Sequence, residues 1–195
     1  MFGFSCFSTY ASPPLLDLGD FSAAGTVFTN GKLLLAGYQK EEYAPGINGI
    51  GGKRLNPTES YIETALRETI EELFAVDAVP SRLLKTLQQR LIPTRVHKSG
   101  TYVLVIYTFA ELDVLLREAH SILKISPVYE KFPRTFTELL FNRNAAIEPR
   151  PEILHLCILP IVKDCCIDSQ LLDDMRIINP NLTPSFKNIL DMKVV

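Results

Sequence analysis

In the first third of the chain, two apolar runs around a polar turn predict a β-hairpin. Two apolar runs, 22–28 and 32–38, are separated by Asn30-Gly31. Asn-Gly between apolar runs is a strong signal for a tight turn, so we expect two antiparallel strands here. Residues 39–50 carry charge, proline and glycine, which predicts a loop, and Ile50 is expected to begin a short strand.

The next stretch has helical periodicity. From Tyr61 to Leu73 there is no proline or glycine, and Ala, Leu, Arg and Glu favour helix. A hydroxyl of Thr58 or Ser60 is expected to cap its first turn. Apolar positions recur at steps of three and four and form one stripe for the core: Ile62, Leu66, Thr69, Ile70 and Leu73.

A second hairpin is expected after a short amphipathic segment at 83–91. Its strands are the apolar runs 91–96 and 102–109, and its turn is 97–100. The later strand is almost wholly apolar, which predicts a central strand buried on both faces.

The remaining chain predicts mostly helix, with one more strand. The strand, 152–162, is expected to be the last of the core, with His155 as a core histidine. Prolines punctuate the region before it. The predicted helices are 111–123, 136–141, 168–175 and 184–192.

Composition fits one globular domain. The chain has 195 residues, 47% of them hydrophobic, and we expect a single domain over 1–195 with residues 1–20 as an N-terminal extension. Its formal charge of −2 gives no electrostatic support for tight, nonspecific binding to nucleic acid. A local basic group could still hold phosphates or a short RNA backbone: Lys85, Arg90, Arg95, His97 and Lys98.

Cysteine usage and hydropathy indicate a cytoplasmic (intracellular) protein that does not enter a membrane. The cysteines show no Cys-x-x-Cys pair and are expected to be reduced thiols: Cys6, Cys157, Cys165 and Cys166. No apolar run is long enough to span a bilayer. The start lacks a basic segment, and Asp17 and Asp20 follow it, so a signal peptide is not expected.

Candidate chemistry gathers on the helix that begins at Tyr61. Glu68, Glu71 and Glu72 are related by steps of three and four, so they share a face away from the apolar stripe. Like charges at that spacing repel, and a hard cation such as Mg²⁺ would relieve the repulsion. Arg67 beside the cluster is expected to pair with Glu59 and brace the preceding loop.

The order Gly51-Gly52, Glu59, Arg67-Glu68 and Glu71-Glu72 resembles the signature of the Nudix hydrolases, here at residues 52–74. Every carboxylate and the arginine match position for position. There are three departures: the glycine loop is one residue longer, Thr69 occupies an apolar position, and Phe74 replaces the closing glycine.

The resemblance implies an α/β (α+β) protein with the Nudix fold, a mixed β-sheet sandwiched between helices, and a helical insertion around 110–150. It implies metal ligation by Glu68 and Glu72, with Glu71 as ligand or base, and Mg²⁺ or Mn²⁺ as cofactor. A general base from outside the helix is also known in the family, and four glutamates near the insertion qualify: Glu130, Glu138, Glu148 and Glu152. Many relatives are dimers, so a homodimer is left open.

The implied activity is hydrolysis of a phosphoanhydride in a nucleoside diphosphate-linked small molecule. Backbone around Gly51 and Gly52 would approach phosphate, and Lys53 or Arg54 would add a cation. Asn48 is either a base-contacting amide or a turn residue before Gly49. Two alternatives remain: an mRNA-decapping enzyme that releases m7GDP from capped RNA, and a non-catalytic nucleotide- or RNA-binding domain.

Overall fold

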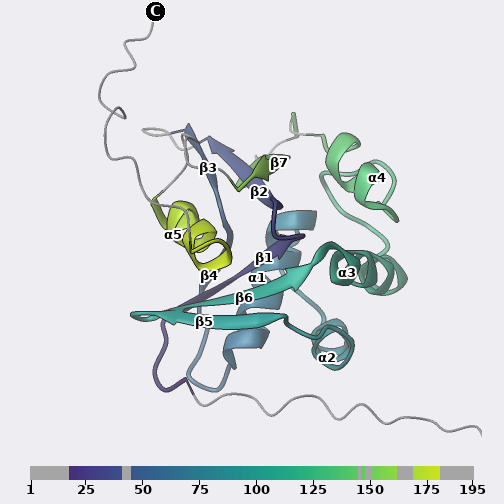
Figure 1. Ribbon diagram of the computed structural model, residues 1–195. Coiled ribbons are helices and arrows are strands. Elements are labelled where there is room, and N and C mark those ends of the chain that lie inside the picture. The colour runs from purple at the N-terminus through teal and green to yellow at the C-terminus, as the bar shows by residue number, and fades with distance from the viewer. Residues whose placement is uncertain (1–17, 41–44, 145, 148–150, 162–168, 181–195) are drawn as a thin grey trace, which may run out of the picture.

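The computed structural model describes residues 18–40, 45–144, 146–147, 151–161 and 169–180 (Figure 1). Within these ranges it contains a mixed sheet of seven strands and five helices, which confirms the predicted mixed α and β class. The strands are β1 (Ala23–Thr29), β2 (Leu33–Lys40), β3 (Pro45–Asn48), β4 (Ile50–Lys53), β5 (Arg95–Ser99), β6 (Tyr102–Thr108) and β7 (Ile153–Pro160). The helices are α1 (Tyr61–Phe74), α2 (Ser81–Arg90), α3 (Phe109–Ile122), α4 (Phe136–Phe141) and α5 (Ser169–Ile178).

The sheet is built around β1. Its main path runs β3-β2-β1-β6-β5, with β4 paired to β1 and β7 paired to β2. β1 and β6 are parallel, and the other pairs are antiparallel. The predicted first hairpin is confirmed: Asn30 Oδ1 accepts hydrogen bonds from the amides of Lys32 and Leu33, and Gly31 adopts φ 82°. Glycine suits this position because φ is positive there.

The segment before α1 is more ordered than its sequence predicts. The loop expected at 39–50 contains strand β3, which pairs with β2 at Gly37–Lys40. The chain then passes Gly49 and continues as β4 along β1, from Thr26 back to Ala23. The strand expected from Ile50 is therefore confirmed, and the loop prediction is wrong for Pro45–Asn48. A neighbouring strand edge supplies the hydrogen bonds that make this proline- and glycine-containing piece extended.

The second hairpin exists, but its turn is displaced. The turn expected at 97–100 is wrong, because His97 and Lys98 pair with Leu104 and Val103 as part of β5. The chain reverses instead at Gly100, whose φ of 58° suits glycine. Residues 91–94, expected to be strand, lie outside β5. β6 is buried over Val103–Ile106, as predicted for a central strand.

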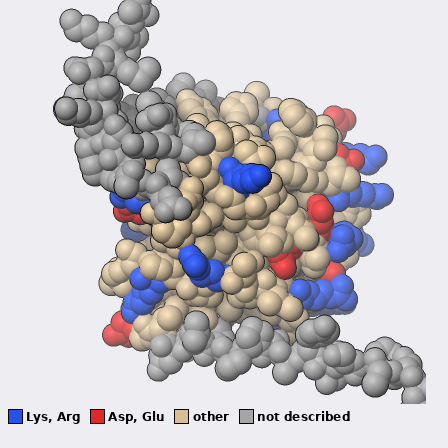
Figure 2. Space-filling view, viewed as in Figure 1, with Lys and Arg blue, Asp and Glu red and all other residues tan. Residues whose placement is uncertain are grey.

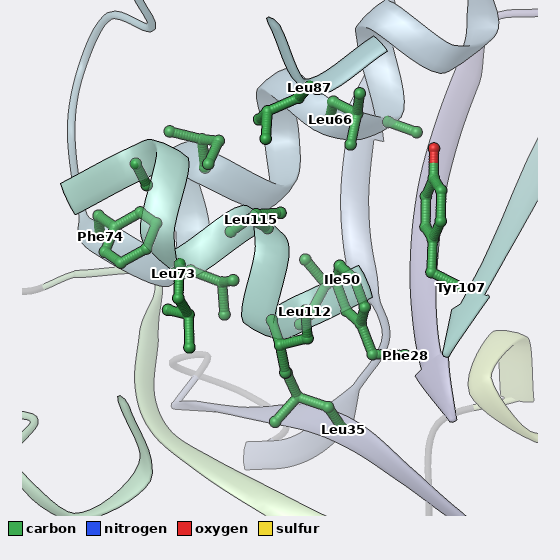
Figure 3. Close-up of a cluster of buried hydrophobic side chains, with 14 of the residues drawn as sticks. Phe28, Leu35, Ile50, Leu66, Leu73, Phe74, Leu87, Tyr107, Leu112 and Leu115 are labelled. Carbon is green, nitrogen blue, oxygen red and sulfur yellow. The ribbon is translucent and has the colours of Figure 1, made fainter. Parts of the chain in front are cut away.

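Two apolar clusters lie on opposite faces of the sheet. Successive residues of β6 alternate between them, with Val103 in the larger cluster and Leu104 in the smaller. The larger cluster joins β1 and β6 to α1, α2 and α3, and Figure 3 shows side chains of these helices meeting Phe28 and Tyr107. The smaller cluster includes Leu171 and Met175 of α5. Helices therefore cover both faces.

Helices α1, α2, α3, α4 and α5 agree with the predicted periodicity to within a few residues. The segment expected as an insertion packs into the larger cluster, where Val128, Tyr129 and Leu139 are buried. α3 begins two residues early because Thr108 and Glu111 form a capping box. The predicted helix at 184–192 and the N-terminal extension over 1–17 lie outside the described residues.

Strand β7 confirms the last predicted strand, but His155 on it is not a core residue. Its side chain is exposed and stacks on Tyr38, with ring centroids 6.3 Å apart. Cys157 on the same strand is a free thiol whose pKa is raised by burial. The other three cysteines lie outside the described residues.

The basic residues expected to form one group near the second hairpin contact different parts of the protein. Arg90 pairs with Glu118 of α3 at 2.6 Å. Arg95 donates to the carbonyl of Ile177 in α5, and Lys98 donates to that of Leu18. These three side chains therefore serve contacts with three different segments. Among the described residues, none of the helices has the length and apolar character needed to cross a bilayer.

Candidate functional site

Helix α1 starts and ends at defined caps. Ser60, one of the two expected caps, accepts a hydrogen bond from the amide of Glu63 at 3.2 Å. The helix ends at Phe74, and Ala75 adopts the left-handed conformation with φ 51°. The left-handed residue thus follows Phe74, so the helix closes one residue beyond the position where the family pattern has glycine.

Arg67 braces the strand and the loop that lead into α1. Its Nε donates to Glu59 Oε1 at 2.7 Å, which is the pair expected from the sequence, and its Nη2 donates to the Lys53 carbonyl at 2.7 Å. Glu59 also accepts from the amide of Leu55 at 2.8 Å. Burial works to raise the pKa of Glu59, but the bonds from Arg67 and Leu55 outweigh it and the pKa is lowered.

The three cluster carboxylates lie in two environments. Glu68 and Glu71 both accept from Nη1 of Arg67 at 2.8 Å, and their side chains are 17% and 23% exposed. Glu72 points toward β4, where it accepts a hydrogen bond from the amide of Gly51 at 3.2 Å, and it is only 6% exposed. Glu72 is therefore buried against the glycine strand, whereas Glu68 and Glu71 are shallower and both pair with Arg67.

The two glycines of β4 let α1 come close. A Cβ on Gly52 would lie 2.5 Å from the carboxyl carbon of Glu68. A Cβ on Gly51 would collide with the backbone of Gly25 and lie 2.8 Å from the Ala24 carbonyl oxygen. Glycine is thus required at position 51 by the close approach of strand β1, and at position 52 it leaves room for the Glu68 carboxylate.

Burial and neighbouring charges act together on the Glu72 carboxyl. Burial is the main reason that its pKa lies well above the usual range, and the negative charges of Glu152 and Glu68 add to the shift. The Gly51 amide and Arg143 oppose this shift. Burial also raises the pKa of Glu71, although Arg67 opposes that change. A carboxylate whose pKa is raised in this way is stabilised by a nearby proton or cation.

A cluster of polar side chains beside Glu72 was not predicted from the sequence. Asn48 of β3 donates to the Gln39 side chain of β2, and Gln39 Nε2 donates to Glu152 Oε1 at 3.2 Å. Asn48 therefore belongs to a strand, and the prediction of a turn residue is wrong. Strands β2 and β3 and the residue just before β7 bring these side chains together, so sequence spacing could not reveal the group.

Of the other glutamates considered as general bases, two lie in other parts of the protein and one lies outside the described residues. Glu138 accepts from the amide of Arg134 at the start of α4, at 2.7 Å. Glu130 lines a hollow with residues of α3. Glu148 lies outside the described residues. Glu152 is thus the described candidate whose charge acts on Glu72.

The two cations next to the glycines differ. The Arg54 side chain is held by the loop before α1, where it donates to the Glu59 carbonyl through Nε at 2.9 Å and also to the Pro57 carbonyl. Its guanidinium lies 4.3 Å from the centroid of the Phe21 ring. Lys53 has an exposed side chain. Lys53 is therefore the cation left available to a ligand at the glycine strand.

The last turn of α1 is completed by distant residues that sequence reasoning missed. Arg143 donates to the carbonyls of Glu72 at 3.0 Å and Leu73 at 2.5 Å, and also to the Ile153 carbonyl at 2.6 Å. Ser126 Oγ donates to the Phe74 carbonyl at 2.5 Å. These contacts satisfy carbonyls that a helix end leaves without partners.

In the part of the chain that the structure describes, no three His, Cys, Asp or Glu side chains are grouped closely enough to hold a metal ion. Two of the cluster carboxylates turn to Arg67 instead. A scan against protein-family models found no matching family, and a search of curated proteins found no match. The residues of the site are therefore what supports a function.

Proposed function

We propose that this chain is a Nudix hydrolase, a metal-dependent pyrophosphohydrolase that cleaves a phosphoanhydride in a nucleoside diphosphate-linked small molecule. One observation carries the proposal. Glu68 and Glu72 lie one helical turn apart on α1 and both face the glycine strand, Glu72 through the Gly51 amide and Glu68 against Gly52. Two carboxylates thus adjoin the glycine backbone to which we assign phosphate binding.

The carboxylate chemistry of the cluster suits a hard divalent cation, which Glu68 and Glu71 would reach by turning away from Arg67. Glu72 is buried with the charges of Glu68 and Glu152 acting on it, and a cation would relieve this repulsion. The donors are carboxylate oxygens, which Mg²⁺ and Mn²⁺ both accept. We assign metal binding to Glu68 and Glu72, with Glu71 as third ligand or base. The bound ion would neutralise charge that develops on the pyrophosphate and lower the pKa of a coordinated water.

The remaining residues hold the substrate and the helix. We assign phosphate binding to the β4 backbone around Gly51 and Gly52, to which the exposed Lys53 adds a positive charge. Glu152 is placed to accept a proton beside Glu72, because its charge already acts there. Arg67 and Glu59 brace the loop against α1 and take no part in the chemistry.

A free nucleotide derivative is favoured over capped RNA as substrate. The basic group that would support an RNA path is divided, with Arg90, Arg95 and Lys98 directed to three different segments. A binding-only domain is disfavoured because such domains lack carboxylates of this cluster, and here Glu68, Glu71 and Glu72 are all present.

The test is product release from a substrate panel with Mg²⁺ and then Mn²⁺. The panel contains nucleoside triphosphates, 8-oxo-dGTP, ADP-ribose, dinucleoside polyphosphates and capped RNA. Glu72→Gln removes the buried carboxylate while keeping its shape, and is expected to lower kcat by at least about a hundredfold. Glu63→Gln is the matched control, because Glu63 lies on the same helix about two turns before the cluster.

Metal-dependent cleavage that Glu72→Gln abolishes and Glu63→Gln retains would support the enzyme and identify its substrate. Release of m7GDP from capped RNA would move the substrate assignment to RNA. If no compound is cleaved and both variants match the wild type, the hydrolase proposal is refuted and the binding domain takes its place.

A further inference from the structure

A hollow lies at the end of α3, formed by residues that belong to neither α1 nor β4. It has a volume of about 510 Å³. We call it the α3–α4 hollow, and its lining is His120, Ser121, Lys124, Glu130, Lys131, Phe132 and Arg134. The proposed hydrolytic chemistry uses none of these side chains, so the hollow needs its own explanation.

Hydrogen-bond donors dominate this lining. Lys124, Lys131 and Arg134 carry positive charge, and Ser121 adds a hydroxyl. Glu130 is the acidic residue among those that line it. Figure 2 shows Lys and Arg side chains, with some acidic ones among them, along the right-hand edge, where α3 and α4 lie in Figure 1. A donor-rich, net positive hollow suits an anion.

Two of the polar side chains are fixed in place. Arg134 Nε donates to His120 Nε2 at 2.6 Å, so the imidazole proton is on Nδ1 and that nitrogen is the ring's remaining donor. The His120 ring also meets the buried Phe132 edge-on, with centroids 5.9 Å apart. The Arg134 amide is held by Glu138 at 2.7 Å. Preorganised donors of this kind lose little freedom when a ligand binds.

The backbone at the rim of the hollow is strained. Lys124 adopts φ 61°, a left-handed conformation that costs a residue with a Cβ about 1 kcal/mol. Helices commonly end in this conformation with glycine, which would avoid the cost. Here a lysine takes the position and brings its ammonium group to the lining.

We propose that the α3–α4 hollow binds a phosphate group, whether of free phosphate, of a nucleotide or of an RNA backbone. A phosphate group accepts several charge-assisted hydrogen bonds, and three cations of the segment that joins α3 to α4 can supply them: Lys124, Lys131 and Arg134. The site is separate from the metal-binding carboxylates, and it does not depend on the hydrolase proposal.

The test is binding by the full-length chain in EDTA, so that no metal-dependent phosphate site contributes. Isothermal titration with inorganic phosphate is expected to give saturable one-site binding with Kd on the order of 1 mM or tighter. A second titration uses a short oligouridylate. The double variant Lys124→Gly/Lys131→Gln removes two charges and keeps the left-handed turn, so it is expected to fold and to weaken phosphate binding about tenfold or more.

Arg82→Gln/Lys85→Gln is the matched control, because both residues are exposed on α2 and the loss of charge is equal. It is expected to leave phosphate affinity within about twofold of wild type. Oligouridylate binding that greatly exceeds phosphate binding and is lost in the first variant alone would assign the phosphate to RNA. Absence of saturable binding of either probe, or an equal loss in both variants, overturns the proposal.

Discussion

The guanidinium of Arg143 donates a hydrogen bond to the main-chain carbonyl of Glu72 at 3.0 Å, so the residue with the most buried carboxylate of the cluster is held through its backbone from 71 residues away. The same guanidinium binds the Leu73 and Ile153 carbonyls, which ties the end of α1 to β7. Arg143 therefore helps to fix the position of Glu72.

Arg143→Met is expected to destabilise the protein by about 3–5 kcal/mol, because it leaves buried carbonyls without donors. The measurement is the free energy of unfolding in urea. Arg117→Met is the control, since Arg117 is exposed on α3, and its expected change is within about 0.5 kcal/mol. Equal stability of the two variants would contradict the capping role of Arg143.

The Arg67–Glu59 pair is expected to stabilise the fold in a pH-dependent way. The pKa of Glu59 is lowered in the folded protein, so its contribution is present above the ordinary value of 4.5 and is lost as pH falls through the folded value. Glu59→Gln should cost about 3 kcal/mol at pH 7. The difference from wild type should then shrink on acidification.

Urea unfolding at several values between neutral pH and about pH 3 measures this difference. Glu63→Gln is the control on the same helix, and its smaller effect should not follow the same trend. A cost of Glu59→Gln that stays constant with pH would show that the ion pair is not its source.

The hydroxyls of Thr26 and Thr69 form a buried hydrogen bond of 2.6 Å between β1 and α1. Thr69→Val is expected to cost about 1–2 kcal/mol, because the hydroxyl of Thr26 is left unpaired. Adding Thr26→Val should recover part of this loss, with a coupling of about 1 kcal/mol in the double-mutant cycle. Thr86→Val on α2 is the exposed control. Strict additivity would argue against the pairing.

The two glycines of β4 should respond differently to alanine. In Gly52→Ala the new methyl displaces the flexible Glu68 carboxylate, so Mn²⁺ affinity is expected to fall about tenfold with a stability loss of about 1 kcal/mol or less. In Gly51→Ala the methyl meets the backbone of β1, and several kcal/mol of stability should be lost. Thermal unfolding and Mn²⁺ titration together distinguish them. Similar behaviour of both variants would contradict the described packing.

Local pattern was sufficient for much of the fold. Asn30-Gly31 sets its hairpin through its own turn chemistry, and the stripe from Leu66 to Leu73 sets the buried side of α1. The shared face of the three glutamates also follows from helical spacing alone. For the same reason the Arg67–Glu59 pair could be anticipated, because both residues lie within eight positions of each other.

Long-range pairing was beyond the sequence pattern. β3 is extended because the edge of β2 is there to receive it, which its proline and glycine do not indicate. Gln39 and Glu152 meet across 113 positions, and neither residue type is unusual for a surface. His155 looked like a core residue within an apolar run, yet its side chain is exposed and the ring stacks on Tyr38 instead.

The completion of α1 by Ser126 and Arg143 also has a consequence for synthesis of the chain. A ribosome makes the proposed catalytic helix early, but the groups that cap its last turn are translated 52 and 70 residues after their partners. Until Ser126 and Arg143 have been synthesised, carbonyl groups in the turn that bears Glu71 and Glu72 lack these hydrogen-bond donors. The nascent chain would thus acquire the proposed metal-binding geometry late, after most of the sheet has been made.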